Sequence, residues 1–309
     1  MTRPRSYYVD ATNARYYHIT TRCVRRAFLL GRDALTGKNY DHRKAVFLAR
    51  LKHLSRYFTV DIMGYAVMSN HVHLVVHFDP NGADALSDEE VAFRWCCIFD
   101  GQGLNKNVRA DEERPQSPED FTIDQAIRYH DLLLDQERVQ RCRQAIASLS
   151  RFMQHLKQPF ALWANRQDEC KGHFFESRFY SGALLDETDL MSCMAYVDLN
   201  PVEAEIASSL REAENTSIHE RLYAERFDAS RLETYLAPLW SEEAAGDEAT
   251  RKRKLSYQLI TYAKQLNLAI LYLSSRETEL PKQLESWMVR LLNRERHKRS
   301  AAAFFDYAT

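Results

Sequence analysis

One stretch of sequence decides the fold: Ala66-Val67-Met68-Ser69-Asn70-His71-Val72-His73-Leu74-Val75-Val76. It is mostly apolar and rich in β-branched residues, which predicts a strand that begins at His71. Side chains at positions i and i+2 of a strand point to the same face, so the Cα atoms of His71 and His73 would lie about 6–7 Å apart on one face. Two imidazoles so placed can bind one metal ion. Two buried histidines bonded to their neighbours would give the same spacing, so the pair needs support from elsewhere in the chain.

The surrounding periodicity predicts further strands at 16–23, 58–67 and 174–185, and helices at 41–57, 91–98, 139–163 and 186–200. Ser87 and Asp186 are expected to cap the helices that follow them, and Pro201 to limit the last one. This order is typical of an α+β fold, a ferredoxin-like βαββαβ antiparallel sheet covered by helices on one face. The histidine pair would lie on a central strand.

The length of 309 residues allows one large domain or two modest ones. We predict one domain over 1–210, with an insertion at about 99–135 that begins as a loop over 99–122. A mainly helical C-terminal extension would follow over 211–309.

Charge is unevenly distributed, although the net charge is only −1. Residues 1–60 carry 13 Lys and Arg against 3 Asp, and residues 251–309 carry 12 basic residues against 5 acidic ones. The two basic ends could contact a polyanion, or they could pair with the acidic segments between them. The charge of the whole chain therefore does not point to a particular kind of partner.

The six cysteines are scattered and form no Cys-x-x-Cys pair. Together with the lack of a signal peptide, this pattern is typical of a reducing cytoplasm. No segment approaches 18 uninterrupted apolar residues, so no membrane span is expected.

The helix expected at 186–200 carries two stripes. Leu190, Met194 and Val197 should face the core, while Tyr196 and Asn200 share another face one turn apart, about 6 Å along the axis. The second pair could present a phenol and an amide oxygen to the same point. Alone, however, a helical tyrosine is usually a packed aromatic residue, and an asparagine before proline often ends a helix.

Taken together, three motifs in this order resemble the single-tyrosine HUH transposases, and among them the REP-associated tyrosine transposases. The motifs are Met68-Ser69-Asn70-His71-Val72-His73-Leu74, Gly172-His173-Phe174-Phe175-Glu176-Ser177-Arg178-Phe179 and Ala195-Tyr196-Val197-Asp198-Leu199-Asn200-Pro201-Val202. The resemblance covers roughly residues 10–210. The insertion and the long C-terminal extension are less typical of that family.

The resemblance implies a role for each motif residue. His71 and His73 would be metal ligands, Tyr196 the nucleophile that forms a 5′-phosphotyrosine bond, and Asn200 a further metal ligand. The metal would be Mg²⁺ or Mn²⁺ in use, although such a site would also accept Zn²⁺ or Ni²⁺. The implied partner is single-stranded or hairpin DNA of the REP type, bound by a monomer or homodimer in the cytoplasm, in association with the nucleoid.

Basic residues interleaved with tyrosines suit a single strand, through phosphate pairing and base stacking. The DNA-binding candidates are Arg22, Arg25, Arg26, His173 and Arg178. Further basic residues at Arg3, Arg5 and 294–299 could add to the grip, or form solvated surfaces. His77 lies too far along the strand to share a metal with the histidine pair and is expected to be packed or to line a groove.

Two alternatives stay open at the level of sequence. The chain could be a domesticated nucleic-acid-binding regulator that keeps the fold without cutting. Less consistent with the expected helices is a cupin-like metal enzyme, which would also place histidines in a His-x-His pattern on a strand.

Overall fold

The computed structural model describes residues 9–10, 12–33, 36–99, 114–227, 235–237, 248–275 and 279–294, without the side chains of 224–227 and 248–258. Several sequence predictions lie outside these residues. They are Arg3, Arg5, the part of the predicted insertion at 100–113, and the basic residues at 295–299.

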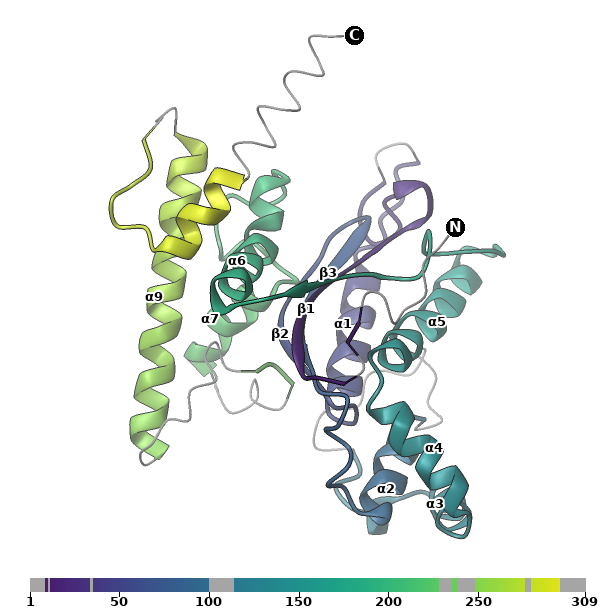
Figure 1. The fold of residues 1–309 in the computed structure, drawn as a ribbon. Coiled ribbons are helices and arrows are strands. Elements are labelled where there is room, and N and C mark those ends of the chain that lie inside the picture. The colour runs from purple at the N-terminus through teal and green to yellow at the C-terminus, as the bar shows by residue number, and fades with distance from the viewer. Residues whose placement is uncertain are drawn as a thin grey trace. The chain divides into compact units, whose positions relative to one another are not determined.

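Four strands form one sheet in the order β2-β3-β1-β4 (Figure 1). They are β1 (Arg15–Arg22), β2 (Val60–Val67), β3 (His71–Phe78) and β4 (Tyr180–Leu184). The turn between β2 and β3 is closed by a hydrogen bond from Met68 N to His71 O, 2.9 Å long. The antiparallel pairing continues past β1, where Cys23 bridges Phe175. The α+β class and the place of His71 and His73 on a central strand are therefore confirmed.

Strand β3 is buried on both of its faces, and the expectation that helices cover only one face of the sheet stays a prediction. Every residue from Val72 to Val76 is buried, although alternate side chains of a strand point to opposite faces. On one of these faces α6 (Glu187–Glu203) packs: Met194 lies 3.9 Å from where a Cβ on Gly64 of β2 would be. A continuous apolar run, as opposed to strict alternation, is the pattern of a strand buried on both sides.

The chain divides into two compact units. The first comprises Met1–Ile62, Val67–Val72 and Val76–Ala183, and the second comprises Met63–Ala66, His73–Val75 and Leu184–Thr309. The predicted domain boundary near residue 210 stays a prediction.

In the first unit, α1 (His42–Ser55) packs on α5 (Leu149–Gln167). The rings of Phe47 and Phe160 meet edge to face with centroids 5.2 Å apart. Pro159 lies inside α5 and has no N–H to donate to the carbonyl of His155 four residues earlier. Arg50 of α1 donates its Nε–H to that carbonyl at 3.3 Å, so the neighbouring helix replaces the missing bond.

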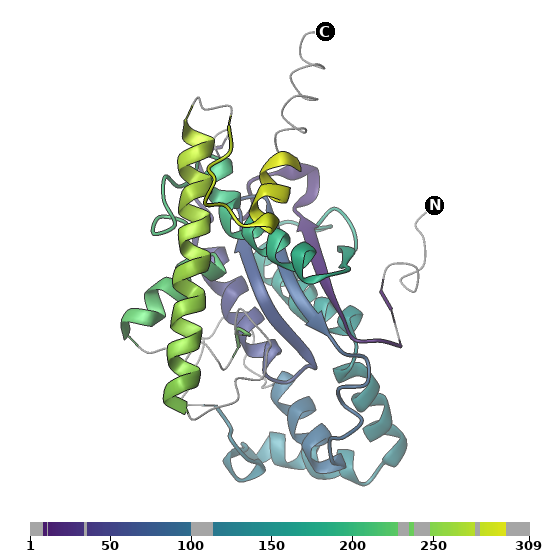
Figure 2. The same ribbon diagram turned by 60° about the vertical axis from the view of Figure 1, so that its left-hand side comes forward.

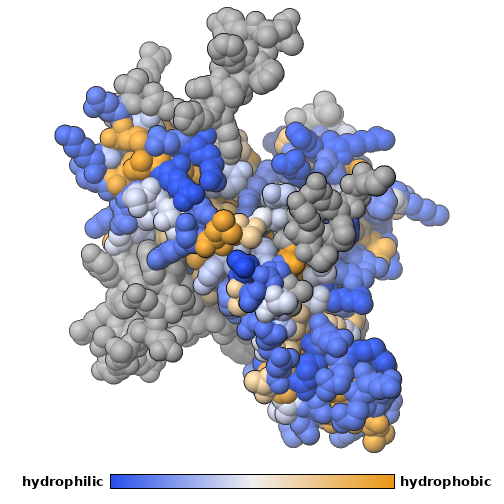
Figure 3. All heavy atoms as spheres, in the orientation of Figure 1, coloured by the Kyte–Doolittle hydropathy of each residue, from blue (hydrophilic) through white to orange (hydrophobic). Residues whose placement is uncertain are grey.

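The helices α2 (Asp88–Ile98), α3 (Ile123–Leu133) and α4 (Gln136–Ile146) form a cluster at one end of the first unit (Figures 1 and 2). Figure 3 shows a mainly hydrophilic surface over this cluster, with scattered hydrophobic residues. Ser87 caps α2 as predicted, accepting a hydrogen bond from Glu90 N.

The helices predicted for residues 123–167 differ from the observed ones in two ways. The single helix expected at 139–163 is two helices, because Ala147 leaves the helical conformation and Ser148 caps α5 by accepting a bond from Arg151 N. Helix α3 was not predicted, although Thr122 and Gln125 form a reciprocal capping box at its start.

In the second unit, α6 contacts α9 (Glu248–Ser274), as does α7 (Ser217–Phe227). Asp186 caps α6 as predicted, accepting a hydrogen bond of 2.7 Å from Asp189 N. Pro201 does not end the helix, which continues to Glu203. Proline removes only its own N–H, and Ala204 N still donates to Asn200 O at 3.0 Å.

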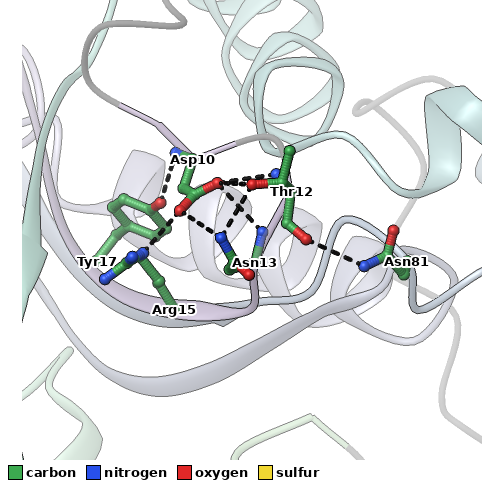
Figure 4. Close-up of polar contacts among 6 residues, drawn as sticks. All are labelled: Asp10, Thr12, Asn13, Arg15, Tyr17 and Asn81. Atoms are coloured by element: carbon green, nitrogen blue, oxygen red, sulfur yellow. Dashed lines mark hydrogen bonds and ion pairs between the residues drawn. The ribbon is translucent and has the colours of Figure 1, made fainter.

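A polar turn leads into β1 (Figure 4). The carboxylate of Asp10 accepts bonds from Thr12, Asn13 and Arg15, and Tyr17 Oη accepts from Asp10 N. These bonds, first among them the one from the Thr12 hydroxyl, lower the pKa of Asp10 below its ordinary value. The turn is also tied to the loop after β3, because Asn81 Nδ2 donates to Thr12 O at 3.2 Å.

None of the described helices combines the length and the hydrophobicity needed to cross a membrane.

Candidate functional site

Strand β3 carries both predicted metal-ligand histidines at its start. His71 is half-buried, and His73 is buried with 5% of its surface exposed. The strand is continuous from His71 to Phe78, so alternation directs both imidazoles to one face.

Asn70 holds the ring of His71. The Nδ1–H of His71 donates to Asn70 Oδ1 at 2.6 Å, and Asn70 Nδ2 donates to the carbonyl of Arg26 at 3.3 Å. A proton on Nδ1 leaves the lone pair on Nε2, the nitrogen that a metal would require. The contact thus selects the tautomer suited to binding a metal through Nε2.

Helix α6 brings Tyr196 to His73. The two rings meet edge to face, with centroids 5.5 Å apart and an interplanar angle of 80°. Tyr196 is half-buried, and Asn200, one turn further along, has 8% of its surface exposed. The opposite stripe of Leu190, Met194 and Val197 is buried, as the periodicity predicted.

The rotation of α6 is held from its other side by Asp198. This buried carboxylate accepts hydrogen bonds from Ser217 Oγ at 2.7 Å, Ile218 N at 3.0 Å and Tyr262 Oη at 2.8 Å. Burial raises the pKa of Asp198 above its ordinary value, against the opposing effects of the buried Arg221 and the three donors. Helix α6 is therefore tied to both α7 and α9.

The chemistry of the donors fits a divalent metal. His71, His73 and Asn200 offer two imidazole nitrogens and an amide oxygen, ligands that first-row divalent ions accept. Within the described residues no group of three His, Cys, Asp or Glu side chains could hold a metal ion. The set of His71, His73 and Asn200 is not such a group, because its third donor is an amide oxygen.

Three of the predicted DNA-binding residues follow one another at the end of β1. Arg22, Arg25 and Arg26 are all exposed. Arg25 and Arg26 have φ values of 53° and 55°, in the left-handed region that non-glycine residues rarely adopt. Such backbone strain is concentrated at functional sites, which makes this turn a candidate for binding.

The other two predicted DNA-binding residues lie on the segment that pairs with this turn. Glu176 N donates to Arg22 O at 3.0 Å, and Val24 N donates to Phe174 O at 2.9 Å. His173 and Arg178, on either side of this pairing, are exposed. The five basic candidates, far apart in sequence, thus come from two adjoining backbone segments.

His77 was expected to be packed or to line a groove, and it is packed. Its ring lies 4.9 Å from the ring of Tyr16, and its Nδ1 lies 3.0 Å from a carboxylate oxygen of Asp61.

Sequence reasoning assigned no role to Asn70 or Asp198. Asn70 directly precedes the histidine pair, and its side chain could have been considered as a partner of the adjacent ring. Asp198 follows Met191 and Met194 on one helical face, and a carboxylate on an otherwise apolar face signals a buried polar contact.

No family model and no curated protein matches the chain. Among solved structures, it is similar to a REP-associated tyrosine transposase bound to a REP hairpin, with a TM-score of 0.39 and 13% sequence identity. The match covers 81% of this chain and 96% of that chain. A likeness of this degree is too low to support a statement about family or activity.

Proposed function

We propose that this protein is a metal-dependent tyrosine transposase, a single-stranded DNA endonuclease and strand transferase that acts through Tyr196. One observation carries the proposal: the buried imidazole of His73 meets the phenol of Tyr196 across a strand and a helix. The residue types and their spacing in the sequence do not by themselves require His73 and Tyr196 to meet. The three ordered motifs support the same proposed function.

In this proposal His71, His73 and Asn200 hold Mg²⁺ or Mn²⁺. A metal bound there would supply a positive charge to polarise the scissile phosphate and to stabilise the leaving oxygen. Asn70 orients the ring of His71, and Asp198 holds α6 so that Tyr196 faces His73.

Tyr196 provides the nucleophile. A free phenol has a pKa of about 10, so it reacts poorly at neutral pH without a neighbouring positive charge. Its oxygen would form a bond to phosphorus while the bond from phosphorus to the 3′ oxygen breaks. The phenol loses one proton, and the leaving oxygen gains one to become a 3′-hydroxyl. The phosphotyrosine keeps the energy of the broken phosphodiester, so a second 3′-hydroxyl can reverse the step and join a different strand.

The DNA would be a hairpin with single-stranded flanks, as the motif resemblance implies. Arg22, Arg25 and Arg26 would pair with phosphates, and His173 and Arg178 would extend this basic surface.

The test is a covalent adduct. The protein is incubated with labelled single-stranded hairpins and Mn²⁺ or Mg²⁺, and the products are separated on a denaturing gel. We expect a protein–DNA adduct from the wild type and from Tyr223→Phe, which alters an exposed tyrosine on α7. Tyr196→Phe should give none, because it lacks the attacking oxygen. An adduct from Tyr196→Phe would remove Tyr196 as the nucleophile.

The same assay separates the alternatives. A regulator that does not cut would bind the hairpins and form no adduct with any of them. A cupin-like enzyme is inconsistent with the four-stranded sheet and the helices of the described residues.

A further inference from the structure

A pocket of about 690 Å³ lies in the first unit between α5 and the segment 172–179. This volume falls within the ~300–1,000 Å³ typical of pockets for small ligands. Its lining includes Met153, Gln158, Ala161, Leu162, Phe175 and Phe179.

The pocket combines apolar walls with amides. Phe175 and Phe179 are largely buried, whereas 54% of Leu162 remains exposed, a large fraction for an apolar side chain. On the α5 side, Gln154 and Gln158 line the pocket one turn apart and are joined by a hydrogen bond of 3.3 Å. Apolar surface suits the face of a planar ring, and amides suit its polar edge.

Basic side chains also line the pocket. Lys157, His173 and Arg178 contribute to its lining, and Glu176 is the acidic residue among them. The ammonium of Lys157 lies 4.7 Å from the centre of the Phe175 ring and donates to Ser177 O at 3.0 Å. This arrangement places positive charge beside the aromatic wall, where the phosphate of a bound nucleotide could be neutralised.

One edge of the pocket is fixed by backbone geometry. Gly172 has a φ of 115°, in a region that favours glycine, and its carbonyl accepts a hydrogen bond from Asn165 Nδ2 at 2.9 Å. The segment that follows is held in place by its pairing with β1.

Backbone hydrogen bonds also connect this pocket to the turn that carries Arg22, Arg25 and Arg26, the arginine turn, and to the strand of the histidine pair. Phe174 O accepts from Val24 N, and the adjacent Cys23 N donates to Asn70 O at 2.8 Å. Asn70 in turn contacts the ring of His71. A strand whose phosphates follow Arg22, Arg25 and Arg26 would therefore pass beside the pocket.

We propose that this pocket binds one unpaired nucleobase of the DNA strand, with the adjoining phosphate near Lys157 and Arg178. The inference rests on the proposed function and adds a base-binding subsite to it. The occupant follows from the combination of aromatic walls, edge-binding amides and positive charge, which matches how proteins bind unstacked bases. An apolar peptide segment would use the walls but would make no use of the positive charge that Lys157 and Arg178 bring to the pocket.

The experiment uses the full chain and a hairpin oligonucleotide with single-stranded flanks. In one series 2-aminopurine replaces each flank base in turn, and in a second series an abasic site does. Binding of the wild type should change the fluorescence at one position, and an abasic site there should weaken binding about 10-fold. Ala161→Trp, which fills the pocket, should remove the fluorescence change and make the abasic site neutral.

Ala45→Trp is the matched control, because Ala45 is an exposed residue of α1 that does not line the pocket. Gln158→Ala alters an exposed side chain of the pocket without filling it and should weaken binding in the same direction. The inference is overturned if no position responds, or if Ala161→Trp and Gln158→Ala bind every oligonucleotide as the wild type does.

The outcomes for the pocket and for the active site can be told apart. If the wild type forms the Tyr196 adduct but no flank position responds to Ala161→Trp, the subsite is wrong and the proposed function stands. If a base enters the pocket but no adduct forms, the subsite stands and the proposed catalytic function is wrong.

Discussion

Asn70 links two segments with one amide. Its oxygen accepts from His71, and its nitrogen donates to the carbonyl of Arg26 in the arginine turn. Through these bonds the predicted metal ligand and part of the predicted DNA-binding surface are held by one side chain. Partners of this kind orient a histidine and select its tautomer, and their loss commonly weakens metal binding.

We therefore expect Asn70→Ala to lower the affinity for Mn²⁺ by about 10–100-fold. Titration of free Mn²⁺ by electron paramagnetic resonance measures this directly. Asn81→Ala, which removes an exposed amide bonded to Thr12 O, should bind Mn²⁺ as the wild type does. Equal affinity in the Asn70 variant would show that the amide does not position His71 for a metal.

At the scale of elements, α6 carries Tyr196 and Asn200 on one side and is bound to neighbouring helices through Asp198 on the other. Asp198 lies two residues from both Tyr196 and Asn200, which places it about 200° around the helix from each. Its bonds to Ser217 and Tyr262 fix the helix against α7 and α9. The helices beyond residue 210 thus support the element that carries the proposed nucleophile.

Tyr262→Phe removes one donor from the buried carboxylate of Asp198. We expect the free energy of unfolding to fall by about 1–3 kcal/mol, the range for a buried polar group that loses its partner. Urea denaturation followed by circular dichroism measures the change. Tyr223→Phe, at an exposed position of α7, should leave stability within about 0.5 kcal/mol of the wild type. Equal stability of the two variants would contradict the anchoring role.

At the scale of the whole molecule, stability should depend on pH through buried histidines. Burial lowers the pKa of His53 to about 3, and its Nε2 lies 3.0 Å from Cys97 O. Burial lowers the pKa of His155 to about 4. The unfolded chain binds protons at both rings near the ordinary pKa of about 6.5, whereas the folded chain does not.

The contribution of these two rings to the free energy of unfolding is therefore complete above pH 6.5 and is lost as the pH falls toward 3. Between pH 7 and pH 5 we expect His53 to account for a loss of about 1–2 kcal/mol in the free energy of unfolding. Urea denaturation at both pH values tests this. His53→Gln keeps a donor for Cys97 O but cannot be protonated, so its stability should fall less than that of the wild type. An equal fall would show that His53 does not contribute.

Local patterns in the sequence determined the strands, several helix caps and the face shared by His71 and His73. Alternation along a strand and the 3.6-residue period of a helix depend on neighbouring residues alone, so β3 and the buried stripe of α6 could be predicted. The same patterns missed the break at Ala147, because the apolar period continues from α4 into α5 and hides the interruption.

Only the tertiary structure decided which of these residues meet. The contact of His73 with Tyr196, the pairing of the arginine turn with 174–176 and the burial of Asp198 against α7 and α9 all join residues distant in sequence. Their positions depend on how the sheet and helices pack to bury apolar surface, which no local period specifies. The sequence by itself therefore determined the chemical groups and the faces on which they lie, and packing determined their partners.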